Sequence, residues 1–173
     1  MTNLQKQKIT LTGVLFFLYC LLIVWVVVFK TSFSLRDIES LIRERSLNLI
    51  PFYYDNEISI RFHVWEIQMN LLLFVPFGLY LKMLDAANRR AILYGLSLSL
   101  ALELCQLIFG LGACDITDLI TNTLGTAAGV YLYVLLHKIF KNRTKLNKVL
   151  SVLALTATIL LGLLFLLLYL ANR

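Results

Sequence analysis

Three carboxylates stand out in a chain of 173 residues that is 60% hydrophobic and only 15% charged. They belong to Glu103, Asp115 and Asp118. Carboxylates that share a water-poor site attract cations, and a desolvated carboxyl group can carry a proton near neutral pH. A charge at the bilayer centre costs about 2.5–3.5 kcal/mol on insertion scales, and such residues usually have a function or a partner. These acids are therefore the candidate catalytic groups.

Amide and imidazole side chains accompany the acids at helical spacing. Asp115, Asp118 and Asn122 follow one another at i, i+3 and i+7, which is one face of a helix. His63, Glu66 and Asn70 have the same i, i+3 and i+7 spacing, and Glu103 and Gln106 are spaced i, i+3. The candidate ligand-binding residues are, in chain order, His63, Glu66, Asn70, Glu103, Gln106, Asp115, Asp118 and Asn122.

Each of these residues also has an explanation that needs no ligand. The dipole of a helix favours acids at its N-terminus, which would account for Asp115 and Asp118. The three amides could be hydrogen-bonding groups that hold helices together in lipid. The histidine could be an interfacial residue. Glu103 is harder to explain in this way, because apolar residues flank it on both sides.

The elements that carry these residues are predicted to be membrane-spanning helices. A transmembrane helix needs about 20 mostly apolar residues. Five apolar runs predict an all-α fold, a polytopic transmembrane helical bundle that forms a single membrane domain over 1–173. The predicted spans are 9–29, 64–84, 91–111, 116–136 and 149–170. An amphipathic helix in the membrane interface is predicted over 34–47, where apolar and charged residues alternate at helical spacing.

The distribution of Lys and Arg predicts the orientation of the bundle. With the N-terminus in the cytoplasm and the C-terminus outside, ten of the 16 basic residues lie in cytoplasmic segments. The net charge of +6 is thereby explained by membrane orientation and needs no nucleic acid. In this orientation the polar residues of three helices lie at one depth, since Asn122 would lie only about 10 Å below Asp115. We therefore expect a polar site in the outer leaflet.

Two further patterns concern packing and metal binding. Gly125 and Gly129 form a GxxxG pattern in an apolar span, which favours close packing of a neighbouring helix. The three cysteines have no CxxC spacing, so they predict neither a disulfide framework nor a zinc site. The sequence identifies no cofactor and no metal.

Three segments, in this order, resemble the VanZ-like membrane protein family: "NLLLFVPFG" (Asn70–Gly78), "ELCQ" (Glu103–Gln106) and "DITDLITNTLGTAAG" (Asp115–Gly129). The resemblance covers roughly residues 10–137. It implies a multi-pass protein of the bacterial cell membrane, in a family named after a member associated with low-level resistance to the glycopeptide teicoplanin.

Three functions remain open. The first is a non-enzymatic envelope protein whose acidic site binds a cationic or amine-bearing group on a membrane lipid, a lipid-linked cell-wall precursor or a lipoglycopeptide. The alternative is an intramembrane enzyme that acts on a lipid-linked envelope substrate by acid–base or metal-dependent chemistry, although no HExxH-type signature is present. The third is a purely structural role, in which the polar residues only join helices.

Overall fold

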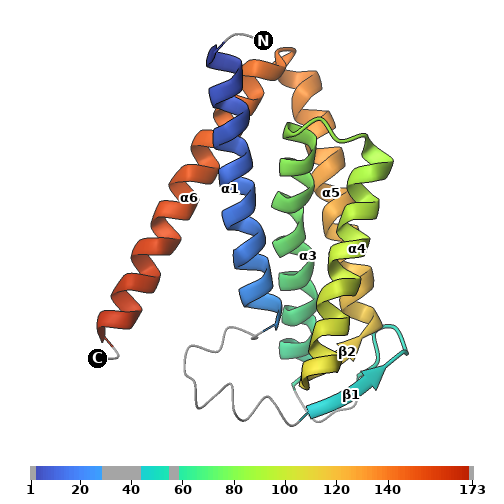
Figure 1. The fold of residues 1–173 in the computed structure, drawn as a ribbon. Coiled ribbons are helices and arrows are strands. Elements are labelled where there is room, and N and C mark those ends of the chain that lie inside the picture. Colours follow the sequence, from blue (N-terminus) through green and yellow to red (C-terminus); the bar gives the residue numbers. More distant parts are fainter. Residues whose placement is uncertain (1–2, 29–43, 55–58, 172–173) are drawn as a thin grey trace.

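The computed structural model describes residues 3–28, 44–54 and 59–171, and within them a bundle of five helices (Figure 1). The helices are α1 (Asn3–Val28), α3 (Ile60–Met83), α4 (Asn88–Phe109), α5 (Ile116–Phe140) and α6 (Arg143–Ala171). Two short strands, β1 (Glu44–Asn48) and β2 (Leu111–Asp115), lie at one end of the bundle. The turns from α3 to α4 and from α5 to α6 lie at the other end (Figure 1).

Among the described residues, α3, α4 and α5 are long and apolar enough to cross a membrane. Helix α1 contributes a shorter apolar segment, Leu11–Val27. The protein is therefore a membrane protein with a helical bundle. The prediction of five spans goes beyond what the structure supports, because length and composition identify three.

The centre of the bundle is the contact between α3 and α5, where the two backbones touch. A Cβ atom on Gly125 would overlap the carbonyl oxygen of Leu71, and one on Gly129 would overlap that of Val75. Gly78 on α3 faces α5 in the same way. Small residues let membrane helices approach closely, and the dispersion attraction between the two backbones then stabilises the pair. This glycine seam fixes how α5 is placed against α3.

Helix α3 continues through a proline that removes one backbone donor. Pro76 lies inside the helix, where its ring prevents one i to i−4 hydrogen bond. The hydroxyl of Tyr19 on α1 donates to the carbonyl oxygen of Leu73, one turn before the proline, at 2.5 Å. The carbonyl that loses its donor is that of Leu72, four residues before the proline, so the Tyr19 bond strengthens the adjacent position and does not replace the lost bond. The contact also ties α1 to α3.

The fold is helical as predicted, and the two short strands are an addition to it that was not predicted. Strands β1 and β2 pair in parallel, with Asn48 opposite Asp115. Gly110 ends α4 in the left-handed conformation, with a φ of 65°, so Leu111, predicted to be helical, is extended instead. Near a membrane the backbone groups of such loops need partners, and here the two segments provide them for each other.

The interfacial helix predicted over 34–47 is wrong at its C-terminal end. Residues 44–47 belong to β1, because their backbone groups pair with β2 rather than with a preceding helical turn. Residues 34–43 lie outside the described part of the chain.

Candidate functional site

The first turn of α5 joins the two aspartates to its own backbone and to α4. Asp115 is the N-cap of α5, and its Oδ1 accepts the backbone N–H of Thr117 at 2.7 Å. This bond satisfies one of the donors that a helix start leaves free. The backbone N–H of Asp115 donates in turn to Oε2 of Glu103 at 2.8 Å. The loop between α4 and α5 is thus closed by a carboxylate from each side.

Glu103 is the most enclosed acid among the described residues, with only 2% of its surface exposed. Its Oε2 takes the Asp115 N–H, whereas Oε1 has no hydrogen-bond partner among the described residues. Among the described residues, the charged groups that act on Glu103 are Asp115 and Asp118, and both are negative. A buried carboxylate normally has a counter-charge or a full set of donors. The acid cluster, defined as Glu103, Asp115 and Asp118, supplies neither.

The third acid is held by α3. Nδ2 of Asn70 donates to Oδ1 of Asp118 at 2.6 Å, and Asp118 is only partly exposed. Asn70 lies two turns before the proline of α3, on a stretch that the glycine seam presses against α5. Side chains from α3, α4 and α5 therefore meet around the acid cluster.

Strand β1 and the turn after it cover the same helix start. Nδ2 of Asn48 donates to Oδ2 of Asp115 at 3.1 Å, and the backbone N–H of Phe52 donates to Oγ1 of Thr117 at 2.9 Å. Sequence reasoning missed Asn48 and Thr117. A polar Asn within the apolar segment "SLNLIPF" was the available signal for the first. Thr117 carries none, because a threonine near a helix N-terminus is ordinary.

Two predicted ligand residues, Gln106 on α4 and Asn122 on α5, form hydrogen bonds to groups outside the acid cluster. Nε2 of Gln106 donates to the carbonyl oxygen of Val27 on α1 at 2.8 Å. Nδ2 of Asn122 donates to Oγ of Ser99 on α4 at 3.0 Å. The oxygen of each amide, Oε1 of Gln106 and Oδ1 of Asn122, is buried and has no partner among the described residues. Both residues thus connect two helices through their amide nitrogen, and the amide oxygen of each can still accept a hydrogen bond.

The remaining two candidates stand apart from the acid cluster. The ring of His63 lies 5.6 Å from the ring of Tyr54, a contact typical of an interfacial aromatic pair. Within the part of the chain that the structure describes, neither His63 nor Glu66 forms a hydrogen bond or ion pair with the three acids. The helical face predicted on α3 therefore contributes Asn70 alone.

Cys114 reports the electrostatic character of the site, because it lies in β2 outside the spanning helices. Burial raises the pKa of the Cys114 thiol, and the negative charges of Glu103, Asp115 and Asp118 raise it further. The described residues contain no group of three or more His, Cys, Asp and Glu side chains placed to hold a metal ion. The site combines several negative charges with buried hydrogen-bond acceptors, which suits a ligand that is positively charged and donates hydrogen bonds.

Comparison with known proteins agrees with these motifs. The profile of the VanZ/LLP1 family matches residues 16–137. The chain is 36% identical over 146 residues to a protein of Enterococcus faecium named Protein VanZ, an alignment that covers 83% of this chain and 86% of that protein. No solved structure matches the chain significantly. The chain belongs to the VanZ/LLP1 family of membrane proteins.

Proposed function

We propose that this protein acts in the bacterial cell envelope and lowers sensitivity to teicoplanin-type glycopeptides by binding a cationic group at the acid cluster. In the predicted orientation the N-terminus is cytoplasmic and the cluster faces the outer leaflet. The bound group is an amine carried by a membrane lipid, a lipid-linked cell-wall precursor or the lipoglycopeptide itself. No bond is made or broken in this proposal.

The observation that carries the proposal is the environment of Glu103. Glu103 is 2% exposed, and among the described residues its Oε1 has no donor and the charges that act on it are negative. Among the described residues no positive group compensates this charge, so an external cation with N–H donors would gain both a strong hydrogen bond and the Coulomb attraction of nearby acids. An anionic or purely apolar ligand would gain neither.

The position of the acid cluster supports a ligand that is held by the membrane. The neighbouring segment exposes large apolar side chains, among them Ile50, Phe52 and Tyr53, and aromatic residues of this kind favour the headgroup level of a bilayer. A lipid or a lipid-bearing glycopeptide would bring its charged part to this level. A freely soluble cation would gain no such advantage.

The experiment compares variants in a teicoplanin-sensitive bacterial host that expresses the protein. Glu103→Gln keeps an oxygen that can accept the Asp115 N–H but removes the charge, and Asp118→Asn does the same beside Asn70. We expect each variant to return the minimal inhibitory concentration of teicoplanin to that of the empty vector. Binding of teicoplanin to the purified protein, and to the cell surface, is measured alongside.

Thr123→Val is the matched control, since its hydroxyl donates only within α5, to the carbonyl oxygen of Leu119. Its resistance and binding should equal those of the parent. Full resistance in Glu103→Gln and Asp118→Asn, at equal membrane levels, would refute the proposal. Mass spectrometry of envelope lipids in the same strains addresses the alternative: a lipid whose abundance changes with the parent but not with Glu103→Gln would favour an intramembrane enzyme.

A further inference from the structure

A groove of about 480 Å³ runs between α1, α3 and α6, on the side of α3 that faces away from the glycine seam. Its walls include Leu18 and Leu22 of α1, Leu79 of α3, and Leu150 and Ala154 of α6. In Figure 1, α6 lies close to α1 at the end of the bundle that carries the turn from α5 to α6, and it diverges from α1 toward the C-terminus. The volume is within the range of small-molecule sites in proteins, which is roughly 300–1,000 Å³.

The groove offers almost no polar partner to a ligand. The hydroxyl of Tyr19 already donates to Leu73, and the hydroxyl of Thr158 donates to the carbonyl oxygen of Ala154 at 2.8 Å. Tyr80 of α3 adds one further hydroxyl, and the remaining lining residues are apolar. Because apolar surface within a membrane is covered by hydrocarbon, a chain of methylene groups fits this groove and a polar ligand does not.

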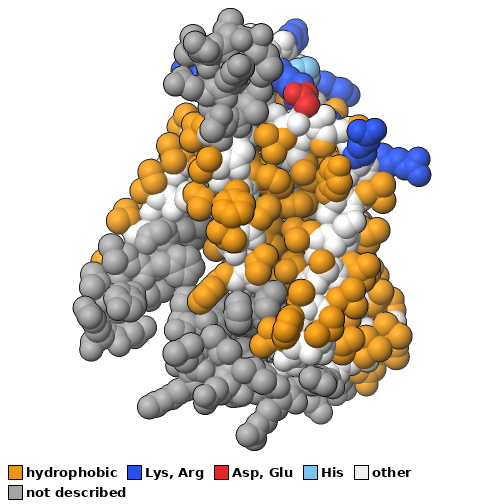
Figure 2. All heavy atoms as spheres, viewed as in Figure 1, with side chains coloured by type: hydrophobic (Ala, Val, Ile, Leu, Met, Phe, Trp, Pro, Cys, Tyr) orange, Lys and Arg blue, Asp and Glu red, His pale blue; other side chains and the backbone are white. Residues whose placement is uncertain are grey.

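The head of this groove is positively charged. Arg143 begins α6 and precedes three lining residues, Leu150, Ala154 and Ala157, at i, i+7, i+11 and i+14, which is one stripe of the helix. At 1.5 Å per residue its Cα lies about 10 Å above that of Leu150. Figure 2 shows Lys and Arg side chains gathered at this end of the bundle, above a flank covered by hydrophobic side chains.

Arg143 is available to an anion. Its side chain is 41% exposed and forms an ion pair with Asp85, which is 74% exposed, while Nη2 donates to the carbonyl oxygen of Lys82 at 3.1 Å. An ion pair between exposed groups contributes little, so a phosphate can replace the carboxylate. A guanidinium has five N–H donors in a planar fork that suits phosphate.

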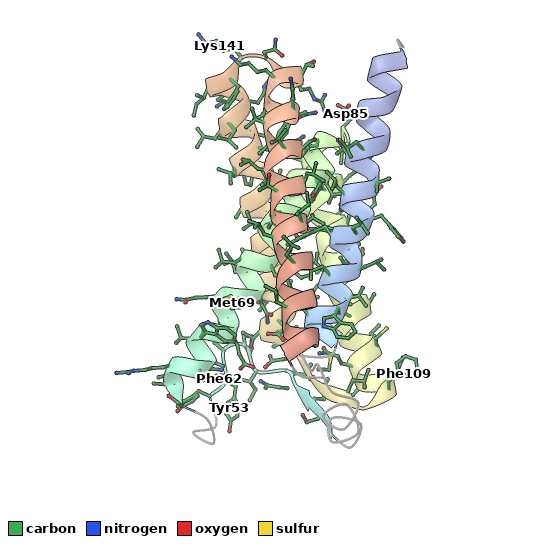
Figure 3. The ribbon with its side chains drawn as sticks, turned by 90° about the vertical axis from the view of Figure 1, so that its left-hand side faces the viewer. Tyr53, Phe62, Met69, Asp85, Phe109 and Lys141 are labelled. Carbon is green, nitrogen blue, oxygen red and sulfur yellow. The ribbon has the colours of Figure 1, made fainter. Side chains whose placement is uncertain are left out.

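We propose that this groove binds an anionic glycerophospholipid, with its phosphate on Arg143 and one acyl chain between α1, α3 and α6. Charge complementarity decides the occupant: the wall takes hydrocarbon and the head takes an anion. The site lies at the end of the bundle opposite the acid cluster, as Figure 3 shows by placing Asp85 and Lys141 far from Tyr53 and Phe62. It does not depend on the proposed function.

The test uses the full-length protein in nanodiscs that contain equal amounts of phosphatidylglycerol and phosphatidylcholine. After transfer to detergent, native mass spectrometry measures the lipid that stays bound. The parent is expected to retain phosphatidylglycerol in preference to phosphatidylcholine. Arg143→Gln is expected to reduce that retention about tenfold, the effect of one charge-assisted hydrogen bond. The control Arg90→Gln changes an exposed arginine at the same end, on α4, and should retain as much as the parent.

Two variants keep the result interpretable if Arg143→Gln lowers the stability of the protein. Asp85→Asn removes the competing carboxylate and is expected to raise retention of phosphatidylglycerol. Ala154→Leu narrows the groove and is expected to reduce retention of either lipid. Equal retention of the two lipids by the parent would overturn the proposal. So would unchanged retention in both Asp85→Asn and Ala154→Leu.

Discussion

Helix α3 has two packed sides, and they differ in how much space they leave. Toward α5, glycines bring backbone against backbone, and not even a methyl group fits. Toward α6, the same helix borders a groove of about 480 Å³. The side with the tight contact also carries Asn70, which holds Asp118. The polar site is therefore built on the rigid side of α3, and the open side can adapt to lipid.

The largest expected effect comes from breaking the tight side. Gly129→Leu would force α5 away from the carbonyl oxygen of Val75, and such overpacking costs about 3 kcal/mol or more. We expect a large loss in the free energy of unfolding, measured by denaturant titration in detergent micelles. A loss below about 1 kcal/mol would show that α3 and α5 are less tightly packed than described.

Glu103→Ala tests whether the polar site belongs to the rigid side. It removes the acceptor of the partly buried Asp115 N–H; an unpaired buried donor costs about 1–3 kcal/mol, so we expect a loss toward the lower end of that range. Glu103→Gln keeps an acceptor and should lose less. The same unfolding titration measures both. Equal losses would mean that the hydrogen bond to Asp115 does not stabilise the α4–α5 turn.

Asn70→Ala should have an intermediate effect, because it removes the bond to Asp118 across the glycine seam. Hydrogen bonds between membrane helices contribute about 0.6–2 kcal/mol, so we expect a loss in that range. Asn70→Asp would place two acids together and should cost more. A larger loss in the free energy of unfolding for Asn70→Ala than for Asn70→Asp would mean that Asp118 does not lie beside residue 70.

On the open side, Ala154→Leu should change the free energy of unfolding by less than about 1 kcal/mol, since the added side chain enters existing space. Ala154 on α6 and Gly129 on α5 border α3 from two sides, so Ala154→Leu and Gly129→Leu are a matched pair of small-to-large substitutions. Similar losses in the free energy of unfolding from the two substitutions would mean that the two sides of α3 do not differ in packing.

The smallest effect is electrostatic and is read at Cys114. Burial and then the charge of Glu103 raise the pKa of this thiol, so Glu103→Gln should lower it and increase the thiolate fraction at pH 8. Maleimide should then label Cys114 modestly faster, in a background where Cys20 and Cys105 are replaced by serine. Slower labelling would contradict the placement of the carboxylate beside the thiol.

Helical spacing accounts for much of what could be predicted. Asn70, Glu103 and Asp118 lie on faces that a 3.6-residue period makes visible, and the order of the helices along the chain brings those faces to one end. The same rule included His63 and Glu66, which lie one to two turns closer to the N-terminus of α3 than Asn70 and do not reach the acids. Periodicity shows which face of a helix a residue lies on, but contact with the acid cluster also depends on how far along the helix the residue lies.

The sheet and its contacts could not be predicted in this way. Residues 44–48 and 111–115 are too short to show strand periodicity, and their pairing joins segments that are 67 positions apart. The roles of Asn48 and Thr117 follow from that pairing and from the cap of α5. The groove also escaped prediction, because a gap between helices depends on how they diverge and leaves no trace in composition.

The pairing of β1 with β2 has a consequence for the order in which the protein is made. A chain is synthesised from its N-terminus, so β1 emerges long before the segment that pairs with it. Helices α3 and α4 are complete while Asn48 still lacks Asp115. The end of the bundle that carries the two strands can close only when the start of α5 has been produced. Completion of the acid cluster is therefore a late event in biogenesis, and a chain truncated before Leu111 would contain only one of its three carboxylates.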